Sequence, residues 1–230
     1  MNQPEIRAAI FDFDYTLADS SEGCVECVNF AFREMGLATH PAEIVCRTIG
    51  LSLKETFVTL AGDHDAARMR EFAGLFVQRA DQVMVDLTVM YESAHATITA
   101  LRERGLRLGI VSTKYRHRIE HVLERENLHH FFDVVIGGED VEEHKPHPAG
   151  LLEAIKRLEC TRTSTVYVGD SVVDAEVAKR AAVPFVAVLS GVTPVDHFDG
   201  YERMGTLKDV SELPQLLLES AERETLGDGR

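Results

Sequence analysis

Five short apolar runs occur along the sequence, and each is followed by polar residues. The runs cover residues 9–11, 106–111, 133–136, 165–168 and 185–189. Such runs, rich in Val, Ile and Phe, are typical of strands buried on both faces, and their alternation with helical patterns favours parallel strands joined by crossover helices. The sequence therefore predicts an α/β protein with a doubly wound, Rossmann-like parallel sheet.

Charged and hydroxyl side chains follow four of these predicted strands. In chain order they are Asp12 and Asp14, Ser112, Lys145, and Asp170 with Asp174. The carboxyl ends of parallel strands open on one edge of a sheet, so these side chains can converge although they lie far apart in the chain. Taken singly, the aspartates and Ser112 fit helix caps equally well, and Lys145 fits a surface role.

The spacing of the aspartates indicates a cation site. Asp12 and Asp14 are two residues apart, so an extended backbone would point both carboxylates to the same side. Close carboxylates raise one another's pKa and need a compensating positive charge. Because the converging set contains oxygen ligands and neither Cys nor His, Mg²⁺ suits it better than zinc or copper.

Residues 20–86 show helical patterns only, which predicts an all-helical insertion within the α/β core. The core would then comprise residues 1–19 and 87–230. Ser20 or Ser21 can cap the first helix of the insertion, and Ser52 and Glu55 have the spacing of a capping box. Arg47 and Lys54 flank the turn at residues 48–52 and could meet an anionic substrate, although basic residues on a helical surface are more often solvated.

Composition narrows the class of partner. The 230 residues carry a formal net charge of −14, which repels polyanions and disfavours nucleic acid or an anionic membrane as a general partner. No apolar segment approaches the length of a membrane span, and residues 1–5 lack the features of a signal peptide, so we expect a cytoplasmic protein. Cys24 and Cys27 lie in a predicted helix with no second pair, which favours buried structural thiols over a zinc or redox site.

Phosphoryl transfer would use every member of the converging set. It needs a carboxylate nucleophile, a second carboxylate for proton transfer, donors for the phosphoryl oxygens, and cations that relieve the repulsion between carboxylate and phosphate. The motifs resemble those of the haloacid dehalogenase superfamily of phosphatases: a strand ending Asp-x-Asp-x-Thr, a later strand ending in Ser or Thr, a Lys followed by Pro, and a Gly-Asp-x-x-x-Asp turn. All four occur here in the family's order.

The resemblance implies a role for each residue. Asp12 would be the nucleophile that forms an aspartyl-phosphate, and Asp14 the general acid and base. Ser112 and Lys145 would contact the phosphoryl group. Mg²⁺ would be held by Asp12, Asp170 and the backbone carbonyl of Asp14, with help from Asp174. Thr16 would support the loop, and the candidates for contact with substrate are Thr16, Thr113, Arg47 and Lys54.

By the same resemblance, the helical insertion corresponds to the mobile cap that closes over the site in the phosphoglycolate-phosphatase-like branch of the superfamily. We therefore expect a small phosphorylated metabolite as substrate. Inorganic pyrophosphatase and sugar-phosphate mutase activities share the same core, and a non-catalytic phosphate-binding module is an alternative of another class. A dehalogenase is disfavoured, because it needs no second aspartate and no Mg²⁺. The sequence departs from the family at Tyr15, where many members have Gly, and at Thr113, where many have Asn.

Overall fold

The computed structural model describes residues 5–227 and the side chains of residues 5–220, so part of the segment read for a signal peptide lies outside the described residues. Six strands form one parallel sheet in the order β5-β4-β1-β6-β7-β8, which confirms the predicted α/β core. The strands are β1 (Ala8–Phe11), β4 (Arg107–Val111), β5 (Val134–Ile136), β6 (Thr165–Gly169), β7 (Phe185–Val188) and β8 (Gly205–Leu207). Strand β8, at one edge of the sheet, was not expected from the sequence.

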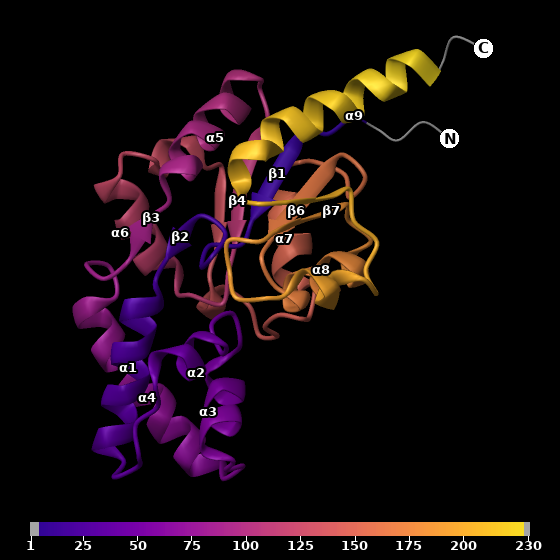
Figure 1. Cartoon of the computed structure of the whole chain (residues 1–230). Coiled ribbons are helices and arrows are strands. Elements are labelled where there is room, and N and C mark those ends of the chain that lie inside the picture. The colour runs from indigo at the N-terminus through magenta and orange to yellow at the C-terminus, as the bar shows by residue number, and fades with distance from the viewer. Residues whose placement is uncertain (1–4, 228–230) are drawn as a thin grey trace.

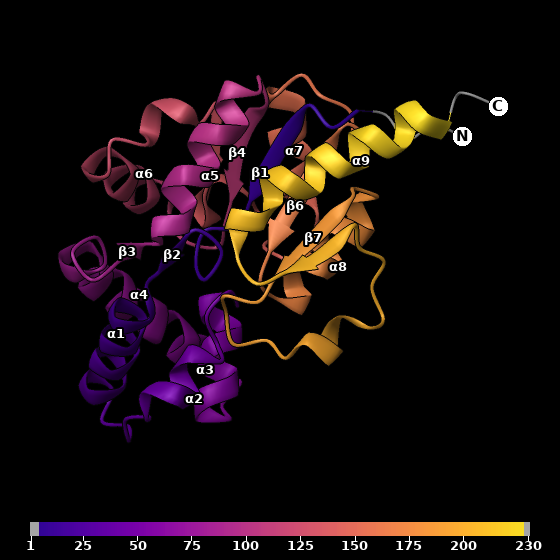
Figure 2. The same cartoon turned by 45° about the horizontal axis from the view of Figure 1, so that its top comes forward.

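Strand β1 lies inside the sheet and is buried on both faces. Ala9 and Phe11 belong to the core on one face, where α5 and α9 also pack, while Ala8 and Ile10 belong to the core beneath α7 and α8. Figure 2 shows α5 and α9 on the near side of the sheet. The helices of the core are α5 (Glu92–Glu103), α6 (Arg116–Arg125), α7 (Ala149–Arg157), α8 (Val172–Ala181) and α9 (Leu213–Gly227), with 3₁₀ turns η1 (His129–Phe131), η2 (Gly138–Asp140), η3 (Val195–Phe198) and η4 (Val210–Glu212).

Four helices interrupt the core between β1 and β4, and we call residues 21–83 the helical insertion. They are α1 (Ser21–Glu34), α2 (Ala42–Cys46), α3 (Leu53–Ala61) and α4 (Ala66–Val83). Their apolar faces form a core of their own around Phe32, Phe57 and Phe72, whose ring centroids lie 5.3–6.1 Å apart. Figure 1 shows the insertion at one end of the sheet, with α9 at the other. The predicted all-helical insertion and the capping box of Ser52 and Glu55 are both confirmed.

A short antiparallel pair connects the helical insertion to the core. The chain leaves through β2 (Ala18–Asp19) and returns through β3 (Val89–Met90), with Ala18 opposite Met90. Side chains add contacts across this junction: Arg118 on α6 donates to Asp81 on α4 at 3.0 and 2.6 Å. Among residues 5–227, no helix combines the length and the apolar character that crossing a bilayer requires.

Candidate active site at the carboxyl edge of the sheet

The strand order places a ligand crevice at the carboxyl end of β1. After β1 the chain adds β4 and then β5 on one side of β1, and it then crosses to the other side to add β6, β7 and β8. The connections that leave β1 and β6 therefore run in opposite directions, away from the space between these two strands. Such a switch point is where open α/β sheets bind ligands. Asp12 follows β1 directly and Asp170 follows β6 directly, so the two carboxylates flank this point.

Lys145 joins two of the predicted carboxylates. Its ammonium lies 2.8 Å from Asp12 Oδ1 and 2.8 Å from Asp174 Oδ1, and all three side chains are almost fully buried. Asp174 also accepts hydrogen bonds from the Tyr167 hydroxyl at 3.0 Å and the Ser171 hydroxyl at 2.6 Å. Both oxygens of Asp174 are therefore occupied, which makes this residue an anchor that fixes the position of Lys145.

The carboxylate of Asp12 remains under-satisfied despite its ion pair. Among the described residues, Asp12 Oδ1 is a buried side-chain oxygen that accepts no hydrogen bond of normal geometry, although the ammonium of Lys145 approaches it. Burial raises the pKa of Asp12 to about 7 against the opposing charge of Lys145, with further contributions from Asp174 and Asp14. Burial and the charges of Asp174 and Asp12 likewise raise the pKa of Asp170. The site therefore holds more negative charge than Lys145 can compensate.

The arrangement fits a divalent cation. Asp12, Asp170 and Asp174 each offer one carboxylate oxygen, and these oxygens lie within 4.8 Å of one another; we call these three residues the acidic cluster. Since its ligands are oxygens and its carboxylates are short of positive charge, the acidic cluster suits Mg²⁺. With both oxygens of Asp174 engaged, Asp12 and Asp170 are the side chains best placed to bind the ion directly.

The side chain of Asp14 is not part of the acidic cluster. We expected an extended segment that points Asp12 and Asp14 the same way, but β1 ends at Phe11 and the chain then turns. Asp14 Oδ1 instead lies 3.1 Å from Lys114 Nζ and accepts a hydrogen bond from the Ser20 hydroxyl at 2.5 Å. The structure thus separates the two carboxylates: Asp12 faces Lys145, and Asp14 faces Lys114.

Sequence reasoning missed Lys114 and Ser20 as members of the site. Ser20 or Ser21 was expected to cap α1. Ser20 occupies the N-cap position, but its side chain makes no capping hydrogen bond, and its hydroxyl donates to Asp14 instead. Lys114 follows the predicted Ser112-Thr113 strand end, which was the available signal. Ser112 itself lies at the end of β4 next to β1, is buried, and accepts a hydrogen bond from the Lys114 backbone N–H at 3.3 Å.

The turn after Asp14 is held from two sides. Tyr15 has φ of 60°, a left-handed conformation that Gly adopts without strain, and its carbonyl accepts a hydrogen bond from Ser190 at 2.5 Å. Its side chain is buried, and burial together with Cys46 raises the pKa of the Tyr15 hydroxyl. Thr16 is fully buried, with its hydroxyl 3.5 Å from Asp170 Oδ1. This position suits support of the turn better than contact with substrate.

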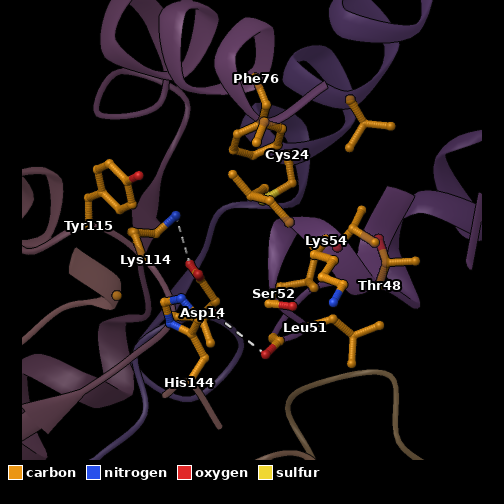
Figure 3. Close-up of a pocket in the computed structure, with 18 of the residues that line it drawn as sticks. Asp14, Cys24, Thr48, Leu51, Ser52, Lys54, Phe76, Lys114, Tyr115 and His144 are labelled. Atoms are coloured by element: carbon orange, nitrogen blue, oxygen red, sulfur yellow. Dashed lines mark hydrogen bonds and ion pairs between the residues drawn. The ribbon is translucent and has the colours of Figure 1, made fainter. Parts of the chain in front are cut away.

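A pocket of about 560 Å³ opens between the core edge and the helical insertion. Figure 3 shows Asp14 and Lys114 on its core side, and Thr48, Ser52 and Lys54 on the side of the insertion. Much of the remaining wall is apolar, with contributions from Val28, Val45, Ile49, Leu51, Leu53, Phe76 and Met84.

The structure distributes the four predicted substrate contacts unevenly. Thr113 and Lys54 line the pocket, and the Thr113 hydroxyl lies 3.5 Å from the Gly50 carbonyl of the insertion. Arg47, at the C-terminus of α2, is exposed and is not among the residues that line this pocket. Contact of Arg47 with a substrate therefore stays a prediction.

The cysteines are unpaired and poorly suited to nucleophilic chemistry. Cys24 lines the pocket and Cys27 is buried in the helical insertion. Burial raises the pKa of Cys24 to about 11 and that of Cys27 to about 12. Their thiols therefore stay protonated near neutral pH, in agreement with the structural role predicted for them.

Comparison with known proteins identifies the family. Residues 9–188 match the family described as haloacid dehalogenase-like hydrolase. The chain is 30% identical to pyrophosphatase PpaX of Bacillus mycoides over 213 residues, covering 93% of this chain and 97% of that protein. It is 32% identical to phosphoglycolate phosphatase of Salmonella typhi over 207 residues, covering 81% and 82%.

A solved structure agrees with this assignment. The crystal structure of a haloacid dehalogenase-like hydrolase from Bacteroides fragilis superposes with a TM-score of 0.88 at 40% identity and covers 91% of this chain and all of that one. The family match over residues 9–188 and this structural similarity lead to one assignment. This chain is an enzyme that belongs to the haloacid dehalogenase-like hydrolases.

Proposed function

We propose that the protein is a Mg²⁺-dependent phosphatase that hydrolyses a small phosphomonoester through an aspartyl-phosphate on Asp12. The observation that carries the proposal is the buried contact of Asp12 with Lys145 beside the carboxylate of Asp170. A carboxylate in this setting can reach a phosphorus atom only where cations offset the charges of both reactants. Lys145 and the acidic cluster supply one cation and a site for a second.

The relatives suggest what kind of phosphate is cleaved. One is named for phosphoglycolate and another is a pyrophosphatase. In both substrates the leaving group itself carries a negative charge, a carboxylate in glycolate and a phosphate in pyrophosphate. We place phosphoglycolate first, because the motifs and the helical insertion resemble the phosphoglycolate-phosphatase-like branch. Inorganic pyrophosphate is the second candidate, and it is supported by the PpaX relative, which is matched over 97% of its length.

The residues divide the reaction between them. Asp12 attacks phosphorus, so that an aspartyl oxygen–phosphorus bond forms as the ester oxygen–phosphorus bond breaks, and Asp14 donates a proton to the departing oxygen. Asp14 then takes a proton from the water that attacks the aspartyl-phosphate, which releases phosphate and restores Asp12. Lys145, held by Asp174, pairs with the nucleophile, and the Ser112 hydroxyl is the candidate donor to a phosphoryl oxygen.

Mg²⁺ would be held by Asp12 and Asp170, with the backbone carbonyl of Asp14 as a third ligand and Asp174 in support. When bound, it supplies positive charge that keeps carboxylate and phosphate together. Within this proposal the helical insertion, taken as residues 20–86 against a core of 1–19 and 87–230, acts as a cap over the site. The pocket between Asp14 and Lys54 is the space that the leaving group enters.

The test compares Asp12→Asn with the wild type on p-nitrophenyl phosphate, phosphoglycolate, pyrophosphate, nucleotides and hexose phosphates. We expect wild-type hydrolysis that stops when Mg²⁺ is chelated, and loss of activity in Asp12→Asn by at least about 10³-fold, because the nucleophile is removed. Asp199→Asn is the matched control, since that side chain is 74% exposed on the core surface. Undiminished turnover in Asp12→Asn would exclude Asp12 as the nucleophile.

A further inference from the structure

Lys114 is a buried cation at the site for which the reaction above has no use. It follows β4, is 8% exposed, and extends its ammonium into the space between Asp14 and the helical insertion (Figure 3). Among the described residues its acceptors are two: Asp14 Oδ1 at 3.1 Å and Ser20 Oγ at 3.4 Å. An ammonium has three N–H donors, so these contacts leave it one further hydrogen bond to make.

The present partner of Lys114 has another task. Asp14 must contact the ester oxygen when it transfers a proton, and its carboxylate is then shared with the substrate. A buried ammonium whose carboxylate is drawn away needs a replacement anion, because an unpaired buried charge is costly. A negatively charged group on the substrate would fill that need.

The pocket geometry places this group on the leaving side of the reaction. Asp14 and Lys114 line the pocket, whereas Asp12, Asp170 and Lys145 do not. A leaving group therefore passes Asp14 as it enters the pocket. Since Lys114 Nζ is 3.1 Å from the carboxylate that meets the ester oxygen, a second anionic group one to three bonds from that oxygen comes within its reach.

The other cations of the pocket are less suited to this task. Arg118 is occupied by Asp81, with N···O distances of 3.0 and 2.6 Å. Lys54 is solvent-exposed on the side of the pocket opposite Asp14 (Figure 3). Lys114 combines burial, a position next to Asp14 and an incomplete set of acceptors.

We propose that Lys114 determines substrate specificity by binding a carboxylate or phosphate group on the leaving group of the phosphomonoester. This inference rests on the proposed function and adds the residue that recognises the substrate class. It predicts selection for phosphate compounds with an anionic leaving group over those with a neutral one, although the wall of the pocket is largely apolar.

The experiment measures kcat/KM for phosphoglycolate, pyrophosphate and p-nitrophenyl phosphate in the wild type, Lys114→Met and Lys114→Arg. Lys156→Met is the matched control, because that side chain is 81% exposed. We expect Lys114→Met to lower the ratio of kcat/KM for phosphoglycolate to that for p-nitrophenyl phosphate by about 100-fold, as expected for loss of a hydrogen-bonded charge pair. Lys114→Arg should retain more of that ratio than Lys114→Met does.

The two anionic substrates distinguish the source of the charge. If Lys114→Met lowers kcat/KM relative to p-nitrophenyl phosphate for phosphoglycolate alone, Lys114 binds a carboxylate. If it does so for pyrophosphate alone, Lys114 binds a phosphate, and if it does so for both, Lys114 binds either anion. An equal fall for all three substrates would overturn the inference, because Lys114 would then act only by holding Asp14. The inference would also be overturned if kcat/KM for phosphoglycolate and kcat/KM for pyrophosphate both stayed unchanged relative to that for p-nitrophenyl phosphate.

A binding measurement separates this inference from the proposed function. Calorimetry in the Asp12→Asn background compares binding of phosphoglycolate, pyrophosphate and phenyl phosphate with and without Lys114→Met. A selective loss of phosphoglycolate affinity supports the role of Lys114 even if the wild type hydrolyses none of the phosphates tested. If Lys114→Met left the affinities for phosphoglycolate and for pyrophosphate both unchanged, the inference would be overturned, whatever the wild type hydrolyses.

Discussion

Replacing Gly191 by Ala tests whether the carboxylate of Asp170 must keep its present position. A Cβ built on Gly191 would overlap Asp170 Oδ2 and would lie 2.7 Å from Cγ and 3.0 Å from Cβ of Asp170. Gly191 does not occupy the left-handed region, so the cost of the substitution is steric rather than conformational. Because Asp170 is buried at the edge of the acidic cluster, its carboxylate must move to admit the methyl group.

The size of that movement sets the expected effect. To reach an ordinary carbon–carbon contact of about 3.5 Å, Asp170 Cγ must retreat by about 0.8 Å. Mg²⁺ requires oxygen ligands near 2.0–2.1 Å in octahedral geometry, and metal sites tolerate only about 0.2 Å of deviation. We therefore expect Gly191→Ala to weaken Mg²⁺ binding by about 10- to 100-fold, the range seen when the surroundings of a metal ligand are disturbed.

The assay is a Mg²⁺ titration with two readouts. Calorimetry measures binding of Mg²⁺, and hydrolysis of p-nitrophenyl phosphate gives the Mg²⁺ concentration at half-maximal activity. Gly200→Ala is the matched control: Gly200 follows in the same connection between β7 and β8, and a Cβ there meets nothing within 4 Å. Thermal unfolding of both variants checks the fold. If Gly191→Ala binds Mg²⁺ as tightly as Gly200→Ala does, the position of Asp170 does not govern the metal site.

Two further predictions concern the helical insertion. Partial burial raises the pKa of Asp81, but hydrogen bonding and the charge of Arg118 outweigh it, so the net pKa is lowered. The stabilisation by the Asp81–Arg118 ion pair should thus be present above the pKa of Asp81 in the unfolded chain, about 3.9, and be lost as pH falls through the lower pKa of Asp81 in the folded protein. In urea unfolding, Asp81→Asn should lower the free energy of unfolding by about 1 kcal/mol or less at pH 7, because the pair is partly exposed to solvent, and the difference should shrink below about pH 4. A difference that does not depend on pH would contradict a stabilising ion pair. Ser52→Ala, which removes the capping box of α3, should cost about 1 kcal/mol in the same assay, with the exposed Thr59→Ala as control.

The residues that end strands were predictable because the geometry of a parallel sheet determines where they gather. Asp12, Asp170 and the lysine before Pro146 could be assigned to one edge because each follows a predicted parallel strand, and the structure brings them together. The prediction for Asp14 depended on the backbone staying extended past Phe11. It turns there, so the side chain of Asp14 joins Lys114 instead of the acidic cluster.

Residues in turns were harder to assign, because tertiary contacts decide their direction. Ser20 has the sequence context of a helix cap, yet its hydroxyl donates to the buried carboxylate of Asp14, six residues earlier, and makes no capping hydrogen bond. Nothing in the local sequence shows that Gly191 approaches Asp170, since the two are brought together by the neighbouring strands β6 and β7. Short elements such as β2, β3 and β8 have too few residues to display a period.

The antiparallel pair of β2 and β3 has a consequence for how such a protein can change over time. It holds the exit and the return of the helical insertion side by side, and the insertion packs around its own apolar centre. A replacement segment of another length or fold can therefore be accommodated at this point without displacing any strand of the six-stranded sheet. We expect new substrate preferences to arise by exchange of this self-contained module, while the hydrolytic chemistry at the sheet edge is inherited unaltered.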